Sequence, residues 1–240
     1  MYTVSFYRFD IGLALHRGSL PLLFSNATLP SFPRSIAPFP RPKALTFGSD
    51  DTAGTYRGVP EFLTSLDNEL TQTWSALNNF SQQINHAINT KTKLPKETML
   101  DTMASVMYRL LHTSYEAGSL DEAIRLSLLA FSSSIFLPWR DFKLPYTHLP
   151  VAYKDCLLNA TFLDASPQLW LWLLMIGTVS VFEEGDYPWL MPWVQLNADA
   201  CEVEAWSDML GVLHGFLWIG LVHDGPAERA FKCVSLCPLV

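Results

Sequence analysis

Apolar side chains recur every three or four residues along most of the chain from residue 59 onward, with polar residues between them. This spacing places the apolar residues on one face of an α-helix, so the pattern predicts helices and not strands. The first such segment is 61–78, and the same spacing continues to residue 88, either as one helix or after a break. Its apolar positions are Phe62, Leu66, Leu70, Trp74, Leu77, Phe80, Ile84 and Ile88.

Three further segments carry helix-start signals. Pro95 is expected to begin a helix, because a proline without an N–H group costs little in the first helical turn. Ser119 and Glu122 match a capping box, in which the Ser hydroxyl takes one free N–H group and the Glu side chain reaches back to another. This box predicts a helix over 120–137. Pro150 is expected to open the next helix.

The stretch 166–231 is the most distinctive part of the sequence, because it holds six of the eight Trp residues. Ser166 followed by Pro167 is a helix-start signal. The apolar run 169–182 comes next, and it is shorter than the roughly 20 residues that a membrane-spanning helix needs. Because the run is apolar on every side, we expect a helix buried among other helices.

A second helix of this stretch is expected over 203–222, where apolar residues again recur at steps of three and four. The segment 223–226, His-Asp-Gly-Pro, is expected to end it, because Gly favours a helix C-cap and Pro cannot continue the same helix. A short helix then follows to about residue 234. A metal or general-base pair at His223 and Asp224 is disfavoured, because no further ligands lie at a workable spacing.

The proline distribution separates the beginning of the chain from this helical pattern. Residues 21–60 contain seven Pro, with Ser, Gly and Arg between them, a composition typical of an extended linker. We therefore predict that residues 1–58 are a flexible Pro-rich tail. Residues 59–240 are predicted to form one all-α domain of seven to nine irregularly packed helices.

Charge is also distributed unevenly within the total of −7. Residues 1–43 carry five Lys or Arg and one Asp, a net charge of +4. Residues 155–228 contain eleven Asp or Glu and no Lys or Arg. An acidic surface repels phosphate groups, so this half of the chain is a poor candidate for nucleic-acid contact. A protein partner or a small molecule suits it better.

No motif assigns catalytic, cofactor-binding or metal-binding residues. The four Cys form no CxxC pair, and no Gly-x-Ser-x-Gly elbow or phosphate-binding Gly loop is present. The acidic segment 183–186 is expected to be a solvated turn, the Ser run 132–134 to lie in a helix, and His214 to be a hydrogen-bonded helix residue. We therefore do not expect an enzyme, a cofactor or a metal site.

The Trp residues leave two alternatives open. They fill a helical core, or they line a pocket between helices that holds an apolar effector. Their helical spacing favours the core.

Several short segments resemble parts of the fungal-specific transcription factor regulatory domain, which usually follows a binuclear zinc cluster. The segments 105–111 (SVMYRLL) and 122–126 (EAIRL) resemble its earlier motifs. Its later motifs resemble LWLWLL at 169–174 followed by Gly177, Pro188-Trp189-Leu190, Glu204-Ala205-Trp206, Phe216-Leu217-Trp218 and the turn at 223–226.

The resemblance implies a nuclear regulatory domain that acts through contacts with the transcription machinery or related regulators, or through an apolar small-molecule effector. The six-Cys zinc cluster is not found, since no Cys precedes Cys156. Direct DNA binding is therefore not expected, and neither is membrane contact. Two alternatives remain open: a small-molecule-binding helical domain unconnected with DNA, and a truncated relative without function.

Overall fold

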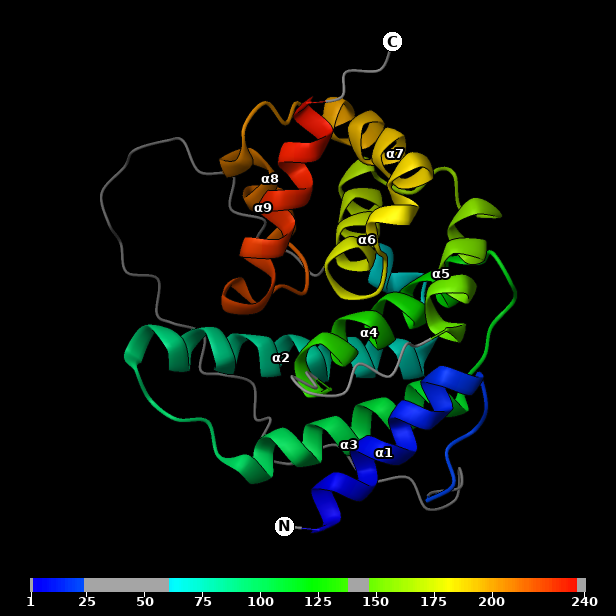
Figure 1. Ribbon diagram of the computed structural model, residues 1–240, viewed down its shortest axis with the longest axis vertical. Helices are drawn as coiled ribbons and strands as arrows, with labels where there is room; N and C mark the ends of the chain where they lie inside the picture. The colour runs from blue at the N-terminus through cyan, green and yellow to red at the C-terminus, as the bar shows by residue number, and fades with distance from the viewer. Residues whose placement is uncertain (1, 24–60, 138–146, 237–240) are drawn as a thin grey trace.

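The computed structural model describes residues 2–23, 61–137 and 147–236, and these residues form helices joined by turns and loops (Figure 1). No strand occurs within these ranges, so the predicted all-α class is confirmed, and the nine α-helices agree with the predicted number. The α-helices are α1 (Tyr2–Arg17), α2 (Asn68–Thr90), α3 (Lys96–His112), α4 (Leu120–Phe136), α5 (His148–Leu158), α6 (Pro167–Ser180), α7 (Tyr187–Ala200), α8 (Trp206–Leu213) and α9 (Gly220–Leu236). Two 3-10 helices, η2 (Glu61–Thr64) and η3 (Glu184–Asp186), complete the described elements.

The first periodic segment forms one continuous helix, α2, of 23 residues. It begins later than the predicted residue 61, because Asp67 caps it by accepting a hydrogen bond from the Glu69 N–H at 2.9 Å. The residues before this cap form η2 instead. Lys91 ends α2 in the left-handed conformation, with φ of 55°.

The predicted helix starts at Ser119 and Ser166 are confirmed. Each Ser hydroxyl accepts a hydrogen bond from a backbone N–H three residues later, at 3.2 Å and 3.3 Å respectively. The second half of the capping box is absent, because Glu122 turns toward Arg125 and forms two hydrogen bonds with its guanidinium, at 2.6 and 2.7 Å. The same carboxylate accepts the N–H of Tyr115 at 3.2 Å.

Helix α6 is the centre of the core. Its first twelve residues include ten that are buried, and it packs against α4, α7, α8 and α9 (Figure 1). The prediction of a helix buried among other helices is therefore confirmed. Gly177 allows a close contact on this helix, since a Cβ atom there would lie 2.4 Å from the ring of Phe182.

The prediction of a tail over residues 1–58 is wrong for its first part, because residues 2–17 form α1. This helix packs against α3 and α5, and its residues Ile11, Ala14 and Leu15 are buried. Its apolar residues lie on more than one side, which hides the helical period in the sequence. The Pro-rich segment 24–60 lies outside the described residues, so the prediction for it stays a prediction.

The single helix predicted over 203–222 is also wrong, because α8 and α9 are separated by a turn at 214–219. The predicted terminator at 223–226 instead lies inside α9. The His223 Nδ1 atom accepts the N–H of Ile219 at 3.1 Å, and so satisfies one of the free donors at the start of α9. This side-chain contact stabilises a helix start that outweighs the local preference of Gly-Pro to end a helix.

Candidate functional site

A pocket of about 580 Å³ lies between α2 and the junction of α8 with α9. In Figure 1 the beginning of α9 lies above α2. Both helices contribute residues to the lining of the pocket. Its volume falls within the range of about 300–1,000 Å³ that is typical of small-molecule sites.

The α2 wall of the pocket is a row of amide side chains. Asn78, Gln82, Asn85 and Asn89 follow one another at steps of four, three and four, so they share one face of the helix. Asn85 donates a hydrogen bond to the carbonyl of Trp218 at 3.1 Å, which joins α2 to the opposite wall. Among the described residues, the other three amides have no hydrogen-bond partner, so their donors and acceptors remain available to a ligand.

The opposite wall contains the carboxylate of the pocket, Asp224. Its Oδ1 atom accepts the indole N–H of Trp218 at 2.7 Å, and the Nε2 atom of His214 lies 4.0 Å away. Its Oδ2 atom faces Gly220, where a Cβ atom would lie only 2.9 Å away. No Lys or Arg belongs to the lining, so the pocket combines one carboxylate and the imidazole of His214 with hydrogen-bonding amide groups.

His223 lies beneath this wall and is fully buried, at 0% exposure. Its Nε2 atom is 3.0 Å from the Ser134 hydroxyl, which itself donates to the Phe131 carbonyl. Because the Ser134 hydroxyl donates its proton to the Phe131 carbonyl, its oxygen acts as an acceptor toward His223. Nε2 therefore carries the imidazole proton, and Nδ1 is the acceptor for the Ile219 N–H. Burial lowers the pKa of His223 to about 3, so the ring is neutral. His223 is thus a structural link between α4 and α9, and it is not part of the pocket lining.

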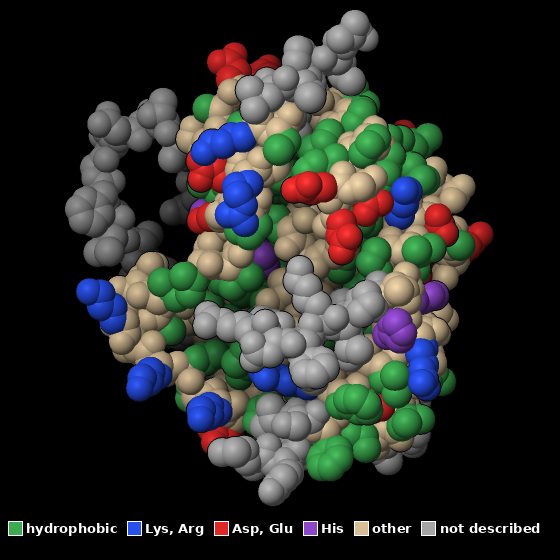
Figure 2. Space-filling view, viewed as in Figure 1, with side chains coloured by type: hydrophobic (Ala, Val, Ile, Leu, Met, Phe, Trp, Pro, Cys, Tyr) green, Lys and Arg blue, Asp and Glu red, His purple; other side chains and the backbone are tan. Residues whose placement is uncertain are grey.

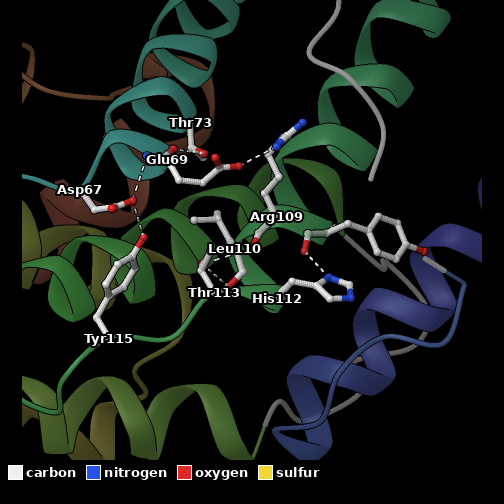
Figure 3. Close-up of polar contacts among 9 residues, drawn as sticks. Asp67, Glu69, Thr73, Arg109, Leu110, His112, Thr113 and Tyr115 are labelled. Carbon is white, nitrogen blue, oxygen red and sulfur yellow. Dashed lines mark hydrogen bonds and ion pairs between the residues drawn. The ribbon is translucent and has the colours of Figure 1, made fainter. Parts of the chain in front are cut away.

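A second polar cluster joins the beginning of α2 to the end of α3 and the loop after it (Figure 3). The Tyr115 hydroxyl donates to Asp67 at 2.9 Å, and Arg109 pairs with Glu69 at 2.6 Å. Burial, followed by the hydrogen bond to Asp67, raises the pKa of Tyr115 above its usual value. These charges are paired with one another across two elements, so the cluster stabilises the fold and is not a candidate site.

The acidic segment 183–186 forms η3, and Glu183, Glu184 and Gly185 are exposed, as expected for a solvated turn. Burial acts to raise the pKa of Asp186, but hydrogen bonds from Trp189, from the Glu183 N–H and from Lys154 outweigh it and lower the pKa. Asp186 is therefore an ionised acceptor that ties η3 to its neighbours.

Two other expectations have mixed outcomes. The Ser run 132–134 lies in α4, as predicted. His214 is not inside a helix but is the C-cap residue of α8, and its exposed side chain lines the pocket.

Most Trp side chains of the described structure fill the core, as their spacing indicated. Trp74, Trp170, Trp172 and Trp218 are all at most 5% exposed. The pocket is consequently lined by amides more than by aromatic rings, with Phe216 and Trp218 as its aromatic members. The sequence interpretation missed this wall, although the amide spacing along α2 is a visible signal.

In the view of Figure 2, Lys and Arg side chains gather over the end of α2 and the loop that follows it. In the half that contains η3 and α7, acidic side chains lie among other Lys and Arg side chains. The exposed lysines near the end of α2 are Lys91, Lys93 and Lys96, and none of them lines the pocket.

Within the ranges 2–23, 61–137 and 147–236, no group of three or more His, Cys, Asp or Glu gathers in a way that suits a metal ion. The same ranges contain no helix with both the length and the hydropathy required to cross a bilayer.

Comparison of the chain with protein-family models, with curated proteins and with solved structures gave no match.

Proposed function

We propose that this protein is a regulatory domain that acts in transcription by binding partner proteins or a small-molecule effector, and not by catalysis or by direct DNA contact. The proposal starts from the resemblance of its short motifs to the fungal-specific transcription factor regulatory domain. It takes the nucleus as the place of action.

The observation that carries the proposal is the way in which the resembling segments meet. The indole N–H of Trp172, in the segment LWLWLL, donates to the Leu217 carbonyl at 3.0 Å. The Trp172 ring also stacks on Phe216, with ring centroids 5.8 Å apart and planes at 17°. These two segments are separated by about 40 residues in the chain. If the motif matches had arisen by chance, there would be no reason for the two segments to contact each other in the fold. Their direct contact supports the interpretation that they belong to one unit of structure.

The other later segments lie on the elements around the same helix. Leu190, in the segment Pro-Trp-Leu, is fully buried on α7, which packs against α6. Trp206 begins α8, which also packs against α6. The pocket then adds a place for an effector beside the segment Phe216-Leu217-Trp218.

A tethering experiment tests this function. The chain is fused to a DNA-binding domain of known target and expressed in a fungal cell with a matching reporter gene. We expect the fusion to change reporter output, and the untethered chain to accumulate in the nucleus and to capture components of the transcription machinery. The control is the DNA-binding domain alone. A folded fusion that leaves the reporter at the control level, together with a cytosolic untethered chain, contradicts the proposal.

The pocket supports a second candidate, a small-molecule-binding domain unconnected with DNA. This candidate predicts ligand binding by the purified chain and no effect in the tethering experiment. The two results together separate it from the first.

A further inference from the structure

We propose that the pocket between α2 and α9 binds a small cationic molecule that carries a guanidinium or ammonium group. Asp224 takes the positive charge, and the amide row of α2 binds the polar remainder. This inference rests on the regulatory function proposed above, because it names the chemical class of the effector.

The charge of the ligand follows from the lining. Asp224 contributes the one carboxylate of the lining, and no Lys or Arg lines the pocket. The basic side chain nearest to it in the lining is His214, whose Nε2 atom lies 4.0 Å from Oδ1. Its side chain is 39% exposed, so a ligand can reach it, while the surrounding protein screens the charge less than bulk water does. The chain as a whole has a net charge of −7, which further favours the approach of a cation.

The carboxylate is held in place before a ligand arrives. Trp218 donates to Oδ1 at 2.7 Å, and the carbonyl of Trp218 accepts from Asn85 at 3.1 Å. Asp224 is therefore positioned by a residue that is itself fixed to α2. The Oδ2 atom has no hydrogen-bond partner among the described residues and remains free to accept from a ligand. A site positioned in this way loses little conformational freedom on binding, which favours affinity.

The amide row determines what else the ligand must carry. Asn78, Gln82 and Asn89 each offer an N–H₂ donor and a carbonyl acceptor to the pocket. A ligand with several hydrogen-bonding groups spaced along its length fits this wall, whereas an apolar effector leaves these amides unpaired. Unpaired amides that lose water cost free energy, so the pocket selects against the apolar effector that the sequence left open as an alternative.

Binding also has a structural consequence. A ligand that contacts Asp224 and the amide row spans α2 and α9 at once. It therefore adds a second link to the junction that Asn85 and Trp218 already join, and it stabilises the turn at 214–219 against α2.

Isothermal titration calorimetry of the full chain tests the inference, with L-arginine and L-citrulline as probes. The two molecules are nearly identical in shape, but citrulline replaces the guanidinium with a neutral urea group. Charge-assisted hydrogen bonds contribute about 1.5–3 kcal/mol, so we expect L-arginine to bind at least about tenfold more tightly than L-citrulline. Agmatine and spermidine are titrated as further cations.

The matched variants are Asp224→Asn and Asp164→Asn. The first keeps an oxygen that accepts from Trp218 and removes only the charge, and we expect it to lose the preference for arginine over citrulline. The second removes a carboxylate from the exposed residue Asp164, which is not part of the pocket lining, and we expect wild-type binding. Gln82→Ala removes an exposed amide from the α2 wall and is expected to weaken arginine binding several-fold. Circular dichroism and a thermal melt confirm that each variant is folded.

Three results overturn the inference: equal binding of arginine and citrulline, unchanged preference in Asp224→Asn, and no binding of any of the three cations to the folded chain at millimolar concentration. The proposed function is judged separately by the tethering experiment. A reporter that responds to a chain without cation binding overturns the ligand inference alone. Cation binding by a chain that leaves the reporter unchanged overturns the transcriptional role alone.

Discussion

Tyr108 of α3 donates a hydrogen bond to Asp10 of α1 at 3.0 Å, and both residues are buried although 98 positions separate them in the chain. The same carboxylate accepts the N–H groups of Leu22 and Leu23, at 2.8 and 3.0 Å. One Asp thus fixes both α1 and the segment after it to the core. Burial, followed by the hydrogen bond to Asp10, raises the pKa of Tyr108 far above its usual value.

We expect Asp10→Asn to loosen α1, because one of the two accepting oxygens becomes an NH2 group that cannot accept, so the donors on that side lose their partner. The loss of buried hydrogen-bond acceptors is expected to lower the free energy of unfolding by about 1–3 kcal/mol. Urea unfolding measures this change, and limited trypsin digestion is expected to cut faster after Arg17. Tyr108→Phe removes one donor only and is expected to cost less. Equal digestion rates for wild type and Asp10→Asn contradict the assigned role.

His223 makes stability depend on pH in a defined direction. Its pKa is about 3 in the folded chain, against about 6.5 in an unfolded chain. Below pH 6.5 the unfolded chain therefore binds a proton that the folded chain does not, so His223 lowers stability as the pH falls from 6.5 toward 3. The expected loss from this one group is about 2 kcal/mol between pH 7 and pH 5.

The comparison of His223→Gln with wild type isolates this effect, since the remaining His residues are common to both. We expect the variant to be less stable at pH 7, because it loses the contacts to Ser134 and Ile219. We also expect its stability to fall less steeply with decreasing pH. His214→Gln, at an exposed position, serves as the matched control. Parallel curves for wild type and His223→Gln rule out this role for the buried ring.

Two glycines allow a test of the space around Asp224. A Cβ atom added at Gly220 meets the Asp224 Oδ2 atom at 2.9 Å, so Gly220→Ala is expected to displace the carboxylate and to weaken arginine binding several-fold. Gly211, inside α8, has no atom within 4 Å of an added Cβ. Gly211→Ala is therefore expected to stabilise the chain by about 0.5–1 kcal/mol and to leave binding unchanged. Calorimetry measures the arginine affinity of both variants, and urea unfolding measures their stability. An arginine affinity that is unaltered in Gly220→Ala contradicts the prediction.

Trp172 is expected to be the most sensitive of the aromatic core residues. Trp172→Phe removes the donor to the Leu217 carbonyl and leaves a cavity in a fully buried position. We expect a loss of about 2–4 kcal/mol in the free energy of unfolding. Trp206→Phe, at a partly exposed position whose indole N–H has no hydrogen-bond partner among the described residues, is expected to cost less than half as much. Similar losses in the two variants argue against a special role for Trp172.

A helix start is predictable from the sequence when the groups that stabilise it lie close together in the chain. The start of α6 was predictable, because Ser166 and Pro167 act on N–H groups within three residues of themselves. The helix α1 was not, since Asp10 finds its partner 98 positions away. The start of α9 depends in the same way on the contact of His223 with Ser134, 89 positions earlier.

The two walls of the pocket also differ in whether local sequence signals predict them. The amide row of α2 follows from helical spacing alone, since Asn78, Gln82, Asn85 and Asn89 repeat along one face. The wall that faces it contains Asp224, which comes there only because the chain turns at 214–219 and continues through Gly225 and Pro226 as a helix. Local rules predict a stop at this place, so the sequence alone places Asp224 in a turn and not in a binding site.

The burial of α6 also governs how this chain emerges from the ribosome. Three of its four packing partners, α7, α8 and α9, are synthesised after it. Until they follow, a nascent chain presents an apolar helix with two Trp and a run of Leu residues to the cytosol. Such a surface is a natural substrate for chaperones and a starting point for aggregation. Recombinant production is therefore expected to benefit from slow synthesis at low temperature.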